Sequence, residues 1–362
     1  MSGVVLEKAG RVVVRKLDAL VGRVIPLQPV LDAMSDRPYE LHLELTNLCN
    51  ANCVFCPYQF QTRDVAFMSD DVFEKAVRDF VGSGGGSVGL TPVVGDALIH
   101  PKFVELVRAL RAEPTIDRIF VTTNAILLDK AGIDAVLSSG LTAITISTAG
   151  FDQAMYERVY RSKSYRRMRD NVLALVTRNR ELGSPVNISI GLRSDRPLAD
   201  VLRDPDFQPI LEHRPGIDFT WSFTSAGGRI TREALPQAMR LRVVSSRREP
   251  CVQLYNGPMV LPDGTVIACG CVASMDALDD LTIGHVLHDD LVAIWRTHAL
   301  RQLRDSFGTN ALNATCRSCD MYRDLELYRT GEGRTRASIN RRRGLGERVR
   351  RDDASQGAFA GG

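Results

Sequence analysis

Short β-rich runs alternate six times with amphipathic stretches over residues 40–223, and this alternation most constrains the fold. The β-rich runs lie at residues 40–46, 87–95, 116–124, 143–148, 186–192 and 217–223. The clearest helical patterns lie at residues 69–84, 101–113 and 165–183. Ser69 is the predicted N-cap of the first helix, and the last ends on Gly183. Six repeats predict an α/β fold with a parallel sheet, and they fall short of the eight that close a complete barrel. We expect a partial (β/α)6 TIM-type barrel, with its site beyond the C-terminal ends of the strands.

Three cysteines occupy the loop that follows the first predicted strand. Cys49, Cys53 and Cys56 have the spacing C-x3-C-x2-C. Zinc could use three thiolates with a histidine or water as fourth ligand. However, no histidine follows the loop closely, and His42 lies inside the predicted strand. A [4Fe–4S] cluster held by three cysteines would leave one iron free to bind a small molecule. The position and the spacing favour such a cluster.

The other five cysteines form a second group near the C-terminal end. They are Cys251, Cys269, Cys271, Cys316 and Cys319. A hairpin is predicted among them at residues 259–269, with Asp263-Gly264 as its turn. These features predict a second, smaller metal-bearing unit.

The chain therefore divides into four predicted segments. These are an N-terminal helical extension (1–37), the barrel core (38–245), the metal-bearing unit (246–328) and a basic tail (329–362). The tail is polar and arginine-rich, which predicts a disordered or loosely docked segment. An arm for nucleic acid or an acidic partner is the alternative for the tail.

Composition narrows the class of protein. The formal net charge of +3 implies no polyanionic partner, so we expect no nucleic acid. No run approaches the roughly 20 apolar residues of a spanning helix, and charges interrupt the N-terminal region, unlike a signal peptide. We therefore expect a cytoplasmic protein that does not engage a membrane. Its eight cysteines are then expected to be ligands or catalysts rather than disulfides.

The segment CNANCVFC after a first β-strand resembles the signature of the radical S-adenosylmethionine (radical SAM) enzymes. This resemblance covers about residues 38–225. It implies a [4Fe–4S] cluster on the three cysteines, whose open iron binds the amino and carboxylate groups of SAM. In that family SAM is cleaved to methionine and a 5′-deoxyadenosyl radical, which abstracts hydrogen from the substrate. The resemblance also implies a reductant such as flavodoxin or ferredoxin.

Residues around the second strand match the same family. Phe55 stands at the usual aromatic position before the third cysteine, where the backbone reads the adenine of SAM. The stretch VVGDALIHP (93–101) resembles the G-G-E-P motif, with Gly95 and Asp96 at the Gly-Glu positions. The resemblance implies that Asp96 accepts from the SAM amino group, although aspartate is shorter than the usual glutamate.

Three later strand ends extend the resemblance. TTNAILL (122–128) resembles the third-strand T-T-N-G stretch and places Asn124 near the site. ISTAG (146–150) places Ser147 where the family serine often meets the ribose or the carboxylate of SAM. ISIGL (188–192) places Ile190 at the fifth-strand adenine contact. Strand-end capping is the alternative for Asn124 and Ser147.

The second cysteine group resembles the SPASM auxiliary-cluster extension of these enzymes in its shortened form, called twitch. The resemblance implies one more [4Fe–4S] cluster, with Cys251, Cys269, Cys316 and Cys319 as ligands. Cys269 is preferred to Cys271 because it follows Gly264 after four intervening residues. Cys271 could replace Cys269, lie inert in the core, or donate a hydrogen atom to a substrate radical. A zinc site with four cysteine ligands is the alternative.

This layout resembles the aminoglycoside-pathway dehydrogenases and epimerases, of the deoxy-scyllo-inosamine dehydrogenase type. It implies oxidation of a secondary alcohol on a small aminocyclitol or sugar in antibiotic or other natural-product biosynthesis. Epimerisation, modification of a ribosomal peptide and a zinc-stapled binding protein without catalysis are the alternatives. Arg193, at the end of the fifth strand, and Arg229, in TSAGGRI, are candidate catalytic residues, as is Cys271. Surface pairing with a carboxylate is the alternative for both arginines.

Overall fold

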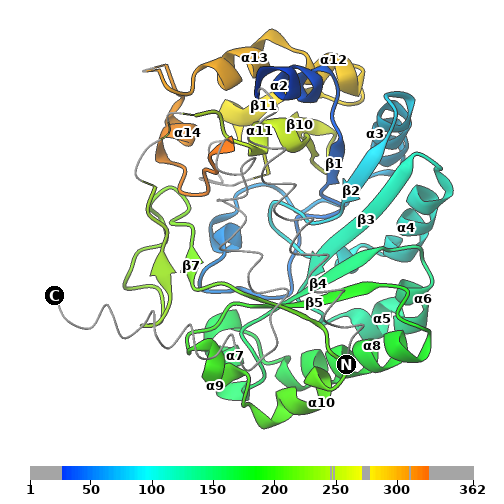
Figure 1. Cartoon of the computed structure of the whole chain (residues 1–362), viewed down its shortest axis with the longest axis vertical. Coiled ribbons are helices and arrows are strands. Elements are labelled where there is room, and N and C mark those ends of the chain that lie inside the picture. Colours follow the sequence, from blue (N-terminus) through cyan, green and yellow to red (C-terminus); the bar gives the residue numbers. More distant parts are fainter. Residues whose placement is uncertain (1–26, 245–246, 248, 271–277, 310, 326–362) are drawn as a thin grey trace, which may run out of the picture.

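The fold is organised around one nine-stranded sheet, seen in Figure 1. We describe it from a computed structural model, which covers residues 27–325 apart from 245–246, 248, 271–277 and 310. The strand order is β11-β10-β9-β1-β2-β3-β4-β5-β6. Because the sheet curves and has two separate edge strands, it forms an open, partial barrel.

The six predicted strands are present and each pairs in parallel with the next. They are β1 (Glu40–Leu43), β2 (Gly86–Gly89), β3 (Ile116–Thr123), β4 (Ala143–Thr148), β5 (Asn187–Leu192) and β6 (Gly216–Phe219). The predicted α/β fold with a partial barrel is confirmed. The second strand was predicted to reach Gly95 but ends at Gly89. Pro92 lies in the part that is not strand, and proline has no backbone N–H to donate to a neighbouring strand.

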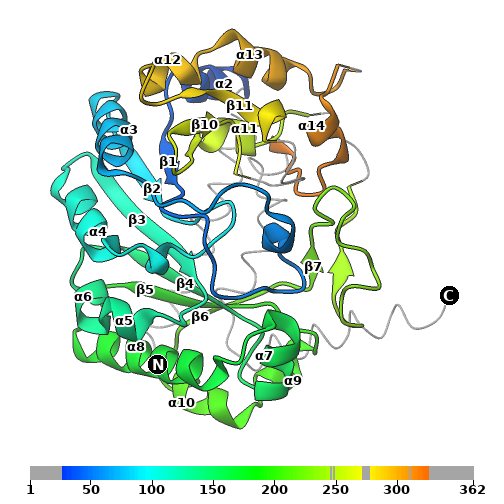
Figure 2. The same ribbon diagram turned by 180° about the vertical axis from the view of Figure 1, so that it is seen from behind.

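Helices cover the outer face of this parallel sheet (Figures 1 and 2). They are α3 (Asp70–Gly82), α4 (Phe103–Ala112), α5 (Leu128–Ala131), α6 (Ile133–Leu137), α7 (Gln153–Tyr160), α8 (Tyr165–Glu181), α9 (Leu198–Val201) and α10 (Gln208–Leu211). Ser69 Oγ accepts from Val72 N at 3.4 Å, which confirms the predicted N-cap of α3. Gly183 has φ +78°, so glycine suits the turn after α8.

The C-terminal unit extends the same sheet. Its strands are β9 (Met259–Val260), β10 (Thr265–Ile267) and β11 (Thr282–His285). The predicted hairpin is confirmed because β9 and β10 pair antiparallel. Strand β9 also pairs in parallel with β1, with His42 opposite Met259. A Cβ at Gly257 would lie 1.6 Å from Glu40 O, so only glycine permits this approach to β1.

The remaining elements surround this unit and the end of the barrel. They are α2 (Leu27–Asp36), α11 (Gln253–Asn256), α12 (Leu291–Trp295), α13 (His298–Asp305), α14 (Ala314–Ser318), a two-stranded sheet of β7 (Ser222–Phe223) and β8 (Arg240–Leu241), and 3-10 helices η1 (Pro57–Phe60), η2 (Ala97–Ile99), η3 (Pro205–Phe207) and η5 (Asp279–Leu281). Trp295 Nε1 donates to Met34 O at 2.9 Å, so α2 is anchored on the C-terminal unit. Among the described helices, none has the length and apolar character needed to cross a bilayer.

Candidate functional site

The three-cysteine loop lies at the C-terminal end of β1 and folds back on itself. Cys53 is buried, and Cys49 and Cys56 are half-buried. Tyr58 fixes both ends of the loop, because its backbone N–H donates to Cys56 Sγ at 3.5 Å and its hydroxyl donates to Cys49 O at 3.2 Å. These bonds hold the loop folded, and the three thiols lie near enough to one another that Cys56 raises the pKa of Cys49, and both raise the pKa of Cys53.

The C-terminal end of helix α7 accepts two backbone hydrogen bonds from this loop. Asn52 N and Val54 N in the loop donate to Tyr160 O and Val159 O, at 3.2 Å and 2.9 Å. The last carbonyls of a helix have no partner within the helix, so they are free to accept these bonds. The ring of Phe55 packs edge-on against Tyr160, with centroids 5.7 Å apart. The sequence prediction omitted α7, although an N-cap aspartate followed by apolar residues at helical spacing could have shown it.

Burial disfavours the charged thiolate form of these three cysteines, and the positive charge of a bound iron–sulfur cluster would offset that cost. Burial raises the pKa of Cys49 to about 12, and burial likewise raises the pKa of Cys53 and Cys56. The Arg193 guanidinium is close enough to lower the pKa of Cys53 and Cys56 in part. Metal ligation requires deprotonated thiols, and iron supplies the positive charge that these buried sulfurs lack. The donor set therefore fits an iron–sulfur cluster.

Asp96 and Asn124 join the second and third strand ends to the cysteine loop. The Asp96 carboxylate accepts from Leu98 N at 3.1 Å, Thr123 Oγ1 at 2.8 Å and Asn124 N at 2.7 Å. Burial raises the pKa of Asp96, while these donors partly lower it. Asn124 Nδ2 in turn donates to Cys49 Sγ at 3.8 Å. In this structure the Asp96 carboxylate therefore organises the protein itself, and a contact with SAM remains a prediction.

The other predicted SAM-binding residues lie around the same strand ends. Ser147 Oγ shares a 2.7 Å hydrogen bond with the hydroxyl of Tyr160. Ile190 is fully buried within β5. Gly95 has φ +119°, and a Cβ there would lie 2.6 Å from Thr46 O. The loop around Gly95 therefore packs against the end of β1, and the roles of these residues toward SAM remain predictions.

The candidate catalytic residues occupy different places. Arg193 lies in the loop after β5, and its Nη1 donates to Gly191 O at 3.1 Å. Arg229 is exposed and its guanidinium carbon lies 5.4 Å from the ring centroid of Phe60 in η1. Arg229 therefore connects the segment after β7 with the residues just after the cysteine loop. Cys271 lies outside the described residues.

A second cysteine site lies in the C-terminal unit. The four predicted auxiliary ligands, Cys251, Cys269, Cys316 and Cys319, line one cavity. Apolar side chains such as Phe307 complete the wall. These cysteines come from the ends of three separate segments, which only the tertiary fold brings together. Four thiols around one apolar cavity are a fitting donor set for an iron–sulfur cluster.

Two buried carboxylates near these sites escaped the sequence prediction. Glu44, fully buried after β1, pairs with Arg63, whose Nη2 lies 3.1 Å from Glu44 Oε1. The second, Asp320, follows Cys319 and accepts from the backbone N–H of Ser225. Its other oxygen, Oδ1, is buried and has no hydrogen-bond partner among the described residues. Adjacency to a candidate ligand was the only sequence signal for Asp320.

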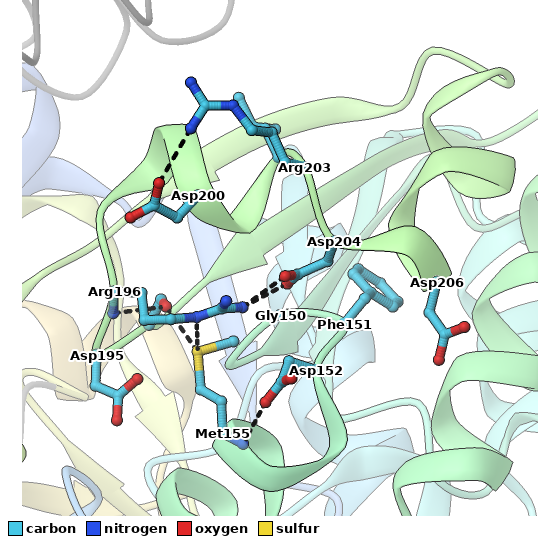
Figure 3. A network of polar contacts seen from close by, with 12 residues as sticks. Gly150, Phe151, Asp152, Met155, Asp195, Arg196, Asp200, Arg203, Asp204 and Asp206 are labelled. Atoms are coloured by element: carbon cyan, nitrogen blue, oxygen red, sulfur yellow. Dashed lines mark hydrogen bonds and ion pairs between the residues drawn. The ribbon is translucent and has the colours of Figure 1, made fainter.

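The loops after β4 and β5 are joined by a polar network beside α7, drawn in Figure 3. Arg196 Nη2 lies 2.7 Å from both carboxylate oxygens of Asp204. Arg196 Nε also donates to Met155 Sδ at 3.4 Å, and Asp152 caps α7 by accepting from Met155 N at 2.7 Å. The β5 loop thus fixes the helix that supports the cysteine loop.

Two family profiles match the two parts of the chain. The radical SAM superfamily profile matches residues 43–204. The SPASM profile, an iron-sulfur cluster-binding domain, matches residues 251–320, a range that begins at Cys251 and includes Cys319. The protein is a radical SAM enzyme with a SPASM domain. Its cofactors are SAM and two [4Fe–4S] clusters, as the sequence predicted.

Relatives and solved structures resemble this radical SAM enzyme in part. GTP 3',8-cyclase of Pasteurella multocida is 29% identical over 36% of this chain and 39% of its own length. The chain thus spans about two fifths of the length of the curated relatives it matches. BtrN in complex with AdoMet and 2-DOIA has a TM-score of 0.54 at 12% identity, covering 80% of this chain and 94% of BtrN. Streptococcus suis SuiB bound to precursor peptide SuiA has a TM-score of 0.57 at 16% identity, covering 81% and 72%. These structural likenesses concern the fold.

Proposed function

We propose that this radical SAM enzyme oxidises a secondary alcohol on a small polar ring, such as an aminocyclitol or sugar, to a ketone. The observation that carries the proposal is the cavity lined by four cysteines in the C-terminal unit. Four protein ligands leave a cluster without an open iron, which suits transfer of an electron rather than binding of a substrate. Epimerisation is the nearest alternative reaction, and turnover in D2O separates it from oxidation.

The reaction breaks one C–H bond and one O–H bond and forms a C=O double bond. When bound, SAM and the first cluster supply abstraction of the hydrogen atom, and the auxiliary cluster supplies an acceptor for the remaining electron. The hydroxyl proton needs a base. We propose Asp320 for this role, because its Oδ1 is buried and lacks a partner among the described residues. The amide of Ser225 would hold the other oxygen in place.

Several residues would orient the cofactors rather than react. Cys49, Cys53 and Cys56 would hold the first cluster, and Cys251, Cys269, Cys316 and Cys319 would hold the second. Asn124 would donate a hydrogen bond to a ligand sulfur, as it does to Cys49 Sγ in the structure. Arg193 would offset negative charge beside Cys53 and Cys56. Each of these roles is inferred from where the side chain lies relative to the cysteines.

Turnover in D2O separates oxidation from epimerisation. Candidate amino sugars and aminocyclitols would be incubated anaerobically with SAM, and 5′-deoxyadenosine release would identify a substrate. Oxidation leaves no carbon-bound deuterium at the reacting centre, because that carbon becomes a carbonyl. An epimerase must return a hydrogen from an exchangeable thiol, so its product would carry deuterium there. Deuterium at that carbon, together with loss of turnover in Cys271→Ala, would contradict the dehydrogenase proposal.

A second candidate function comes from the curated relatives, which are named as GTP 3',8-cyclases. Their match covers roughly a third of this chain, and the substrate in their name is a purine nucleotide. GTP therefore belongs in the same substrate panel. Release of 5′-deoxyadenosine that depends on GTP, and not on any sugar, would replace the dehydrogenase proposal with a cyclase.

A further inference from the structure

Arg304 is a buried cation in the C-terminal unit, outside the roles assigned above. It lies in α13 and is 3% exposed. Its Nη1 and Nη2 atoms are buried and have no hydrogen-bond partner among the described residues, so no described carboxylate neutralises it. Asp305, the next residue of the helix, is exposed. A buried charge without a counter-charge is strongly destabilising, so the position of Arg304 needs a physical explanation.

Two aromatic rings and one carbonyl hold the guanidinium in place. Its central carbon lies 4.5 Å from the ring centroid of Trp295 and 4.8 Å from that of Tyr255. Its Nε donates to Leu254 O at 3.0 Å. Burial lowers the pKa of Arg304 to about 10, so the side chain still carries its charge at neutral pH. These contacts fix the cation but bring no formal negative charge to it.

The residues next to Arg304 line the cavity of the second cysteine site. Leu254, which accepts its hydrogen bond, is one lining residue, and the N–H of Leu254 donates to Cys251 O at 3.0 Å. Phe307, three residues after Arg304 and just past the end of α13, is another. Helices α11 and α13 lie at the same end of the molecule (Figure 1). Arg304 therefore lies behind the wall of the cavity that the four cysteines share.

The sign of this charge suits the group that the cavity would hold. A [4Fe–4S] cluster on four thiolates is an anion, and it becomes more negative by one charge when it accepts an electron. A nearby cation stabilises the reduced form more than the oxidised form, so it raises the reduction potential. The cavity wall is mostly apolar, so the interaction is weakly screened. The cluster would in turn supply the negative charge that Arg304 lacks among the described residues.

We propose that Arg304 sets the reduction potential of the auxiliary cluster, through its buried charge behind the wall formed by Leu254 and Phe307. With Arg304 in place, the cluster accepts one electron at a higher potential. Arg304 acts through the cavity wall, so it is not a catalytic residue. The role depends on the auxiliary cluster alone, and it holds whichever substrate the enzyme uses.

The test is a redox titration of the reconstituted full-length enzyme, with titanium(III) citrate as the electron donor and electron paramagnetic resonance as the readout. Adding SAM assigns the two cluster signals, because only the first cluster has an iron open to SAM. Arg304→Met removes the charge and keeps a long side chain, whereas Arg304→Lys keeps a charge. Arg301→Met is the matched control, because Arg301 lies three residues earlier in α13 and is exposed.

Arg304→Met should make reduction of the auxiliary cluster about tenfold less favourable, which is a fall of about 59 mV for a one-electron couple. At pH 7, Arg304→Lys and Arg301→Met should keep the wild-type potential. The potential of the first cluster should be unchanged in all three variants. A wild-type potential in Arg304→Met, or an equal fall in Arg304→Lys, would overturn the proposal.

Iron counts and unfolding of the apoproteins cover the case in which Arg304→Met fails to hold the second cluster. Charge compensation predicts that Arg304→Met then loses about four irons per chain while Arg304→Lys keeps them. It also predicts that the two apoproteins unfold at similar urea concentrations, because no cluster is present to interact with the charge. Loss of iron in both variants, or an Arg304→Met apoprotein that unfolds at clearly lower urea than the Arg304→Lys apoprotein, would assign Arg304 a structural role and overturn the proposal.

Discussion

Replacing Asp96 tests whether this carboxylate organises the strand ends or mainly serves SAM. A carboxylate has about four acceptor positions, and three donors, Leu98 N, Thr123 Oγ1 and Asn124 N, already use it. The residue is 3% exposed, so water does not readily replace a lost partner. Asp96→Ala leaves two buried backbone N–H groups unpaired, because only the threonine hydroxyl can rotate to another acceptor.

The expected magnitude follows from those two amides. Each unsatisfied buried donor costs about 1–3 kcal/mol, so Asp96→Ala should lower the free energy of unfolding by about 2–6 kcal/mol. Asp96→Asn keeps one oxygen and so pairs only one of the two amides. It should cost about half as much, about 1–3 kcal/mol. The graded order, with wild type above Asn and Asn above Ala, is the signature of an organising role.

Urea unfolding followed by far-ultraviolet circular dichroism would measure this series, and isothermal titration would measure SAM binding to the reconstituted enzymes. A mainly SAM-binding carboxylate would show the opposite pattern. SAM affinity would fall while the unfolding midpoint and its slope stayed at the wild-type values. That outcome in Asp96→Ala would refute the reasoning from the three donors.

Three further predictions concern the cysteine sites and the buried Glu44. Cys269→Ala should lose about four of the roughly eight irons per chain on anaerobic reconstitution, whereas Cys271→Ala should keep them. The reverse iron counts would show that Cys271, one strand step further along, is the ligand instead of Cys269. Asn124→Ala should make the first cluster harder to reduce in a redox titration, because a hydrogen bond to Cys49 Sγ stabilises the reduced form; an unchanged potential would argue against that bond. Burial raises the pKa of Glu44 above 4.5, so its contribution to stability is complete below pH 4.5 and is lost as the pH rises through the folded-state pKa. The free energy of unfolding should therefore fall less above pH 4.5 in Glu44→Gln than in wild type, by about 1.4 kcal/mol for each unit by which the pKa of Glu44 is raised. If the free energy of unfolding falls equally steeply with pH in both proteins, Glu44 is not the cause of the fall.

Much of the barrel could be predicted from the sequence because its signals are local. The periodicity of residues 40–223 predicted six parallel strands, and the N-cap at Ser69 predicted the start of α3. Helix α7 was missed although its own residues carry a helical pattern. Its contact with the cysteine loop could not have been inferred, because Val159 and Tyr160 bind the loop through backbone carbonyls that any residue type would provide.

The candidate sites divide in the same way. The spacing of Cys49, Cys53 and Cys56 is itself a geometric constraint, since a short loop keeps its thiols near one another whatever the rest of the chain does. The partners of Asp96 span residues 98–124, and those of Asp320 lie near residue 225. Such contacts depend on how strand ends meet. The sequence therefore could name Asp96 by its motif but could not state what it binds.

The sequence by itself determined the alternation of strands and helices, the two cysteine groups and hence the superfamily. Only the tertiary structure decided that β9 joins β1, placing the C-terminal unit on the strand that leads into the first cysteine loop. The physical reason lies in the range of the forces. Periodicity and ligand spacing are set by covalent geometry within a few residues. The pairing of β1 with β9 is made by backbone groups that are alike in every residue, so the choice of partner rests on shape. At Gly257, for example, any side chain would collide with the backbone of β1.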